Sequence, residues 1–233
     1  MNRTERLLTW SLCGNLALGT IFLGGWLGPN VQTSFNPWIS QPAVAETARV
    51  HPLAAVIGSV TLGERVFVAP AASVRGDEGQ NIYVGDESNV QDGVVIHGLE
   101  TFESGEELFD NEVEVNGTKF SVYVGKHVSL AHQSQVHGPA RIGDDTLVGM
   151  QALVFRPELG NRVVVEPGAK IIGVKIASDR YVPALSIVTN QIEADALPYI
   201  TDEYPYKNLN QAVVHVNTQL ADPRHSKQTA KLR

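Results

Sequence analysis

The stretch V-G-K-H-V-S-L-A-H-Q-S-Q-V-H-G-P-A-R-I-G-D-D-T-L-V-G-M-Q-A-L-V, residues 124–154, decides the fold. An aliphatic residue stands at every sixth position, at Val124, Leu130, Val136, Ile142, Val148 and Val154. Before this stretch, the same period occurs at Val56, Leu62, Val68 and Val74 and again at Val84, Val90 and Ile96. Beyond it, after a slip of one residue, the period continues at Leu159, Val165 and Ile171. Such hexads are typical of a β-helix, whose coils enclose a prism filled by the aliphatic side chains. We therefore predict an all-β chain, a left-handed parallel β-helix with a C-terminal α-helix.

The hexads lie between flanking segments of different composition. Residues 1–45 carry Arg3 and Arg6, then no charge from Leu7 to Ala45, and they end in the small run Ala43-Val44-Ala45. This segment is predicted to be an export signal or a membrane anchor, so the protein is expected in the periplasm or outside the cell, or anchored facing that side. Cleavage after Ala45 would leave a domain that begins at residue 46.

The β-helix domain is predicted at residues 46–180, with an acidic loop at 98–120. A helical segment at 181–221 is expected to pack on the solenoid, because residues near its end follow helical spacing: Leu209, Ala212, Val213, Val216 and Leu220. Residues 222–233 are polar and basic and are predicted to be disordered. The formal net charge of −7 argues against a nucleic-acid partner.

Three histidines stand in informative positions of the repeat. His97 follows Ile96 and His137 follows Val136, so both side chains should point out of the prism. If the acidic loop leaves one coil at its end and re-enters at the start of the next, the two rings lie one strand spacing apart, roughly 5 Å. His132 lies near a different corner.

A second copy of the chain would most easily supply His132 to the other two histidines. Three imidazoles with an open fourth position make a catalytic zinc site, although Fe²⁺ and Co²⁺ also accept imidazole ligands. Because a three-sided prism favours a ring of three, we predict a homotrimer with metal at each joint. The alternative is that the three are ordinary surface histidines.

Three motifs resemble those of the gamma-class carbonic anhydrases: S-V-R-G-D-E-G at 73–79, S-N-V-Q-D-G-V-V-I-H at 88–97 and S-L-A-H-Q-S-Q-V-H-G-P-A at 129–140. The resemblance runs from about residue 50 to residue 221. It implies zinc ligation by His97 and His137 of one subunit and by His132 of its neighbour. It also implies reversible hydration of carbon dioxide to bicarbonate and a proton. His215 departs from the family pattern, since a tyrosine is expected there.

The resemblance implies that a zinc-bound hydroxide attacks carbon dioxide and that polar residues manage the proton. Glu78 and Gln91 would orient the metal-bound water, and Glu100, in the acidic loop, would shuttle protons to solvent. By the same resemblance, Asn217 would contact carbon dioxide or bicarbonate, and Asn89 would belong to the same polar cluster. Met150 and Phe155 would line an apolar pocket for carbon dioxide. Arg75 and Asp77 would form an ion pair between subunits.

Two other functions remain open. Hexapeptide solenoids also serve as acyltransferases, in which one histidine acts as general base and an acyl-CoA lies along the prism. An inactive relative acting as a scaffold is the second possibility. The three histidines, placed in the repeat so that they could share a metal ion, count against an acyltransferase. The acidic loop with Glu100 counts against an inactive scaffold. The predicted partners are carbon dioxide or bicarbonate and copies of this chain, with a membrane only through an uncleaved N-terminal segment.

Overall fold

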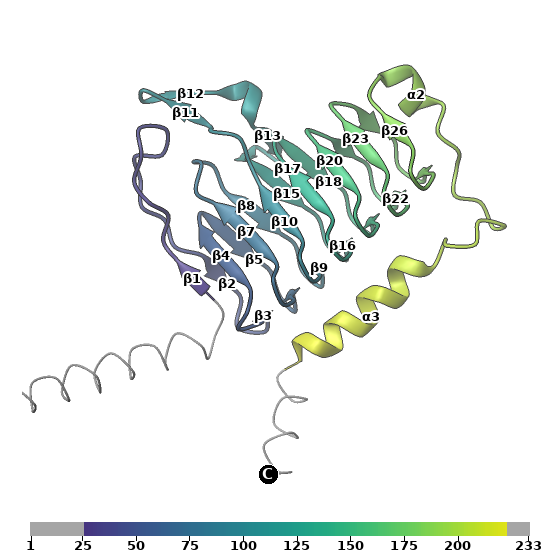
Figure 1. Cartoon of the computed structure of the whole chain (residues 1–233), viewed down its shortest axis with the longest axis horizontal. Helices are drawn as coiled ribbons and strands as arrows, with labels where there is room; N and C mark the ends of the chain where they lie inside the picture. The colour runs from purple at the N-terminus through teal and green to yellow at the C-terminus, as the bar shows by residue number, and fades with distance from the viewer. Residues whose placement is uncertain (1–25, 223–233) are drawn as a thin grey trace, which may run out of the picture.

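The computed structural model describes residues 26–222, which form a solenoid of parallel strands flanked by one long helix (Figure 1). The expected parallel β-helix is confirmed. The parts of the predicted signal and tail at 1–25 and 223–233 lie outside the described residues. Among residues 26–222, no helix is long and apolar enough to cross a membrane.

Three sheets form the walls of the prism. Wall 1 has eight strands: β1 (Trp26–Gly28), β4 (Ala55–Gly58), β7 (Ser73–Gly76), β10 (Val95–His97), β17 (Gln135–His137), β20 (Leu153–Phe155), β23 (Lys170–Ile172) and β26 (Ile187–Val188). Wall 2 has seven: β2 (Ala43–Val44), β5 (Val60–Leu62), β8 (Ile82–Val84), β15 (Val122–Val124), β18 (Ala140–Ile142), β21 (Glu158–Leu159) and β24 (Lys175–Ile176). Wall 3 also has seven: β3 (Arg49–Val50), β6 (Phe67–Val68), β9 (Asn89–Val90), β16 (Ser129–Leu130), β19 (Leu147–Val148), β22 (Val164–Val165) and β25 (Tyr181–Val182).

The aliphatic residues of the hexads fill the prism. All sixteen residues of the predicted pattern are at most 1% exposed, and each pairs with its equivalent on the next coil, as Val90 does with Leu130 and Ile96 with Val136. Alternate residues on a strand face opposite sides, so the neighbours of these residues point outward. Burial of this continuous column is the main source of stability in such a fold.

The solenoid begins earlier than the predicted boundary at residue 46. Strand β1 pairs with β4, and Ala43 and Val44 form strand β2, which pairs with β5. Val44 and Val50 precede Val56 at the same six-residue spacing and pack against the core. Residues 26–45 are therefore part of the first coil, and the first two residues of the A-x-A run predicted as a cleavage site form strand β2.

The solenoid also continues beyond the predicted end at residue 180. Strands β25 and β26 pair with β22 and β23 and extend walls 3 and 1. Their residues Val182 and Val188, six positions apart, are buried in the prism. The spacing from Ile171 to Ile176 is five residues rather than six, which conceals the continuation. The chain then forms α2 (Gln191–Asp195) and crosses wall 3, where Tyr204 packs with Leu147 and Val164.

The predicted C-terminal helix is present as α3 (Leu209–Ala221) and lies against β6, β9 and β16 of wall 3 (Figure 1). Its buried side chains are Asn210, Val214, Asn217 and Ala221. The face expected to pack on the solenoid is partly wrong, because Leu209, Val216 and Leu220 are exposed in the single chain. Wall 3 is thus covered by the C-terminal segment.

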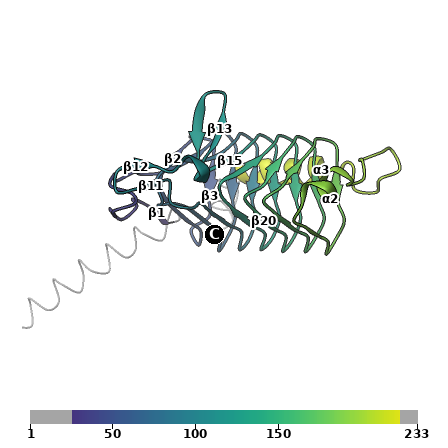
Figure 2. The same cartoon turned by 90° about the horizontal axis from the view of Figure 1, so that it is seen from above.

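The acidic loop folds into two small hairpins on the side of the solenoid, and the β13–β14 hairpin projects furthest from the coils (Figures 1 and 2). They comprise β11 (Phe102–Glu103), β12 (Glu106–Glu107), the 3₁₀ turn η1 (Phe109–Asn111), β13 (Val113–Val115) and β14 (Thr118–Phe120). Lys119, the only basic residue among positions 98–120, ties the hairpins together: its Nζ lies 2.6 Å from Glu107 Oε2 and 3.4 Å from Glu112 Oε2. The excess of acidic charge therefore sits on an ordered element.

Candidate functional site

Wall 1 carries a column of functional side chains on its outer face. The register pairs Arg75 with His97, His97 with His137, and His137 with Phe155. The rings of His97 and His137 lie 5.4 Å apart between centroids at an interplanar angle of 81°, and Phe155 lies 5.3 Å from His137. The adjacency of the two histidines is the one that the hexad phase predicts.

Two carboxylates and a guanidinium surround His97. Its Nε2 lies 3.1 Å from Asp77 Oδ1, 3.3 Å from Glu78 Oε1 and 3.2 Å from Arg75 Nη2. Arg75 Nε donates to Asp77 Oδ2 at 3.1 Å. Arg75 and Asp77, predicted to pair between subunits, thus contact each other within this single chain. Their pairing between subunits stays a prediction. The donor atoms of Asp77, Glu78 and His97 lie within 4.8 Å of one another, as in a group that could hold a cation.

The two adjacent carboxylates differ in their environments. Burial alone would raise the pKa of Asp77, but hydrogen bonds with His97 and Arg75, and the charges of both, lower it to about 2. Burial raises the pKa of Glu78, and the neighbouring carboxylates of Asp77 and Glu100 act in the same direction. Asp77 is therefore ionised at neutral pH and holds His97, whereas Glu78 takes up a proton more readily than an ordinary glutamate.

A buried threonine links Glu78 to the acidic loop. Thr101 is 0% exposed, and its backbone N–H and hydroxyl donate to the carbonyl oxygen of Glu78 at 2.9 and 3.2 Å. The same hydroxyl oxygen accepts from the backbone N–H of Gln80 at 2.7 Å. Gly79 has φ +114°, and a Cβ there would lie 2.1 Å from Thr101 Oγ1. The terminal glycine of the S-V-R-G-D-E-G motif thus makes room for the link between Glu78 and the loop that carries Glu100.

Glu78 and Glu100 face one small cavity of about 290 Å³. Asn111 Nδ2 donates to the backbone carbonyl of Glu100 at 2.8 Å, which holds this part of the loop in place. Glu100 is exposed to solvent, whereas Glu78 is half-buried. The cavity is lined by Ser34, Phe35, Glu78, Glu100, Phe102 and Glu103.

His132 lies at the corner between walls 3 and 1, away from the other two histidines. It is 54% exposed, and its Nδ1 lies 3.1 Å from Asp92 Oδ2. Met150 occupies the same corner on the next coil, two residues beyond the paired Leu130 and Val148. Among residues 26–222, no group of three nearby donors includes His132.

The other predicted polar residues lie on the side of wall 3. Asn89 Nδ2 donates to Ser129 Oγ, and Gln91 Nε2 donates to Asn89 Oδ1, both at 2.9 Å, and both side chains are buried. Asn217 is buried on α3, where its Nδ2 donates to the carbonyl of Val213 at 2.9 Å. One chain therefore carries two half-sites. The first contains Arg75, Asp77, Glu78, His97, Glu100, His137 and Phe155, and the second contains Asn89, Gln91, Asp92, His132, Met150 and Asn217.

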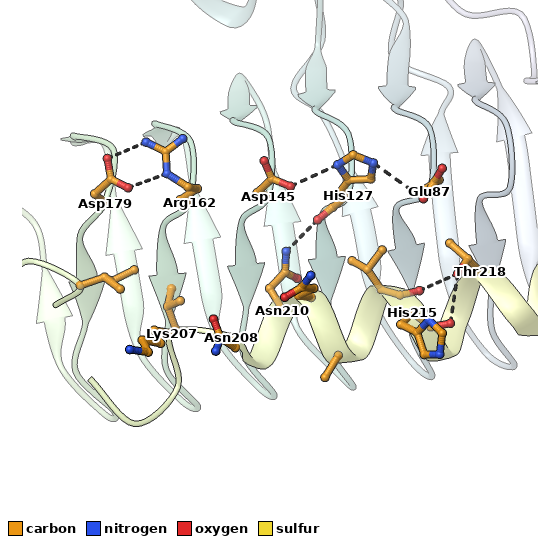
Figure 3. Close-up of a pocket in the computed structure, with 15 residues that line it drawn as sticks. Glu87, His127, Asp145, Arg162, Asp179, Lys207, Asn208, Asn210, His215 and Thr218 are labelled. Atoms are coloured by element: carbon orange, nitrogen blue, oxygen red, sulfur yellow. Dashed lines mark hydrogen bonds and ion pairs between the residues drawn. The ribbon is translucent and has the colours of Figure 1, made fainter. Parts of the chain in front are cut away.

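A larger cavity, of about 830 Å³, lies elsewhere, between α3 and the corner joining walls 2 and 3 (Figure 3). One ionisable side chain per coil lines this corner: Glu87, His127, Asp145, Arg162 and Asp179. They pair along the solenoid, with His127 Nδ1 3.1 Å from Asp145 and Arg162 bound to Asp179 at 2.6 and 2.7 Å. The cavity contains no residue of either half-site; His215 lines it and contacts Gln219.

Sequence reasoning missed Thr101 and Asp92. A signal for Asp92 was present, because it precedes His132 by the same 40 residues that separate Asn89 from its partner Ser129. No periodic signal marks Thr101, whose partners lie in a different segment.

No protein-family model matches the chain. It is 56% identical over 194 residues to the carbonic anhydrase of Methanosarcina thermophila, an alignment that covers 83% of this chain and 78% of that protein. It is 40% identical over 166 residues to the carboxysome assembly protein CcmM of a Nostoc species, covering 70% of this chain and 28% of that protein.

The chain belongs to the gamma-class carbonic anhydrases. Among solved structures, a hexapeptide transferase family protein from Anaplasma phagocytophilum has a TM-score of 0.50 and 21% identity, covering 84% of this chain and 96% of that one. This second likeness shows the fold alone. For a gamma-class carbonic anhydrase, the separation of His132 from His97 and His137 is the feature that any account of function has to explain.

The link through Thr101 gives a first prediction. Thr101→Val keeps the shape of the side chain but leaves the Gln80 N–H without its acceptor, so the free energy of unfolding should fall by about 1–3 kcal/mol. Thr101→Ser retains the hydroxyl and serves as the control. Urea denaturation of the three proteins at one concentration measures the effect, and equal stability of the valine variant and the unsubstituted chain would refute the role of the hydroxyl.

Proposed function

We propose that this chain forms a homotrimer that catalyses the reversible hydration of carbon dioxide to bicarbonate and a proton. In each site, His97 and His137 of one subunit and His132 of its neighbour would hold a metal ion. The observation that carries this proposal is the division of the predicted site residues between two faces of one chain. A heterologous contact that closes after three subunits brings the first half-site of each chain to the second half-site of the next.

The surface properties of both half-sites support their meeting across an interface. Among residues 26–222, no element covers the outer face of wall 1 as the C-terminal segment covers wall 3, and Val95 beside the histidine column is exposed. On the other side, Met150 and the α3 residues Val216 and Leu220 are exposed. Burial of such apolar side chains between subunits would stabilise the trimer.

The donor set fits a transition-metal ion. His97 and His137 have ring centroids 5.4 Å apart, and the carboxylates beside His97 can orient the imidazole. Imidazole ligands suit Zn²⁺, and Fe²⁺ or Co²⁺ would also fit, so zinc stands as the proposed metal. When bound, such a metal supplies Lewis-acid activation of water, which makes water a nucleophile near neutral pH.

The residues of this chain would manage substrate and proton. Phe155 beside His137, and Met150 of the neighbouring subunit, offer apolar contacts to carbon dioxide. Gln91 would orient the attacking water, and Asn217 offers an amide to bicarbonate. Hydration releases a proton, and Glu78 is placed to accept it because its carboxylate is half-buried beside His97.

Glu100 shares the cavity of Glu78 and reaches solvent, so it can pass the proton to buffer. Asp77 and Arg75 hold His97, and Thr101 holds the two glutamates in fixed relation. The proton path thus runs from a half-buried carboxylate to an exposed one.

The alternatives draw less support from this chain. The hexapeptide transferase likeness shows the fold alone, and an acyl transfer mechanism leaves the paired His97 and His137 without a role. A scaffold function, like that named for the CcmM relatives, leaves the Glu78–Glu100 cavity without a role. Both alternatives predict a chain that binds no stoichiometric metal.

We also propose that the protein is exported to the periplasm or the outside of the cell, or anchored facing that side. The signal or anchor would lie within residues 1–25, because residues 26–45 build the first coil.

Replacement of single ligands tests the proposed site. His97→Ala, His132→Ala and His137→Ala should each remove most of the bound metal and slow carbon dioxide hydration by at least about a hundredfold, because two imidazoles hold the ion weakly. Elemental analysis and stopped-flow hydration assays measure both effects, with the exposed His215→Ala as control. Full metal content in any one of the three variants would exclude that residue as a ligand.

The two glutamates should behave differently. Glu100→Ala should lower kcat in weak buffer, with kcat/KM largely retained, and imidazole should restore the rate because it replaces the missing proton carrier. Glu78→Ala should lower kcat/KM as well, since Glu78 lies next to His97. Glu103→Ala, another acidic loop residue on the same cavity, is the matched control. Wild-type turnover of Glu100→Ala in weak buffer would show that the loop carboxylate carries no protons.

A further inference from the structure

A segment that precedes the predicted domain packs on the acidic loop. Residues 29–42 form an excursion between β1 and β2, and both views show it beside the β11–β12 hairpin (Figures 1 and 2). Trp38 contacts Phe102 edge to face, with ring centroids 4.7 Å apart. Ser34 and Phe35 line the cavity that contains Glu78 and Glu100. The outer boundary of the carboxylate cavity therefore comes from residues outside the predicted hexads.

Side-chain hydrogen bonds hold this excursion in one shape. Asn30 is buried; its Nδ2 donates to the carbonyl of Trp38 at 2.7 Å and its Oδ1 accepts from the N–H of Ser40. Thr33 Oγ1 accepts from the N–H of Asn36 at 3.0 Å, and the Thr33 N–H donates to the Asn36 carbonyl at 2.9 Å. The segment is thus a built element whose contacts depend on a few polar residues.

Asn36 connects the excursion to the S-V-R-G-D-E-G motif. It is 1% exposed, and its Nδ2 donates to the backbone carbonyl of Asp77 at 3.0 Å. Thr101 binds the carbonyl of the next residue, Glu78, from the other direction. The backbone on both sides of the Glu78 side chain is therefore fixed by two segments that lie outside the hexads.

We infer that residues 33–38 form the outer wall of the carboxylate cavity and that Asn36 is a positioning residue for the Glu78–Glu100 pair. Phe35, together with Phe102, limits the water around the two carboxylates, and Asn36 sets the backbone from which Glu78 projects. This inference rests on the proposed function, because it assigns the wall to the proton path of that reaction. A chain cut after Ala45 would lack the wall and would be slow at proton release.

Two variants and a matched control test the inference in the full-length, metal-loaded chain. Asn36→Ala removes the bond to Asp77, and Phe35→Ala removes the apolar part of the wall. Ile39→Ala is the control, because Ile39 belongs to the same excursion but is 65% exposed. Amide hydrogen exchange of peptides covering residues 99–108 reports on the hairpin, and carbon dioxide hydration is measured in weak buffer with and without imidazole.

Both test variants should exchange faster at residues 99–108 and lose roughly tenfold in kcat in weak buffer, with imidazole restoring kcat. Phe35→Ala should retain kcat/KM, whereas Asn36→Ala should lower kcat/KM as well, because it displaces Glu78 beside His97. The control should match the unsubstituted chain. Unchanged exchange and turnover in both variants would overturn the inference, and so would a loss of kcat/KM in Phe35→Ala that imidazole does not restore, since that result indicates a general structural role. An unsubstituted chain without hydration activity would instead defeat the proposed function, which separates the two failures.

Discussion

The parallel pairing of β10 with β17 is the contact on which the rest of the site depends. It joins coils separated in sequence by the whole acidic loop, and it sets His97 directly beside His137. Because side chains alternate between faces along a strand, a slip of one residue would turn one imidazole into the prism. The buried pair Ile96 and Val136 opposes such a slip, since the same shift would expose an aliphatic side chain to water. The core of the solenoid therefore fixes the spacing of the two proposed ligands.

The geometry of a three-walled prism explains why the site is divided. Wall 1 displays His97, His137 and Phe155, while His132 and Met150 project from the corner next to wall 3. The rigid backbone between these faces cannot fold back to bring them together. Two short insertions complete the first half-site: the acidic hairpins carry Glu100, and the excursion at 29–42 closes the cavity that Glu100 shares with Glu78.

The repeat made much of this architecture predictable. A six-residue period admits one assignment of inward and outward faces, so the core and the adjacency of His97 and His137 follow from it. The ends were harder to predict, because Val44 lies within the segment predicted as an export signal or anchor, and a five-residue step precedes Ile176. The roles of Thr101 and Asn36 could not be predicted, because each depends on hydrogen bonds to a distant segment that no local pattern encodes.

Each metal site is proposed to be shared between two neighbouring chains. Trimers assembled from two different variants test this sharing. His97→Ala and His132→Ala chains would be unfolded and refolded together, and the metal content and hydration activity of mixed trimers would be compared with those of each parent. In a ring of heterologous contacts, every mixed trimer contains one joint where intact His97 meets intact His132. Mixed trimers should therefore hold about one metal ion each and be far more active than either parent. Mixed trimers no more active and no richer in metal than the parents would contradict the shared site.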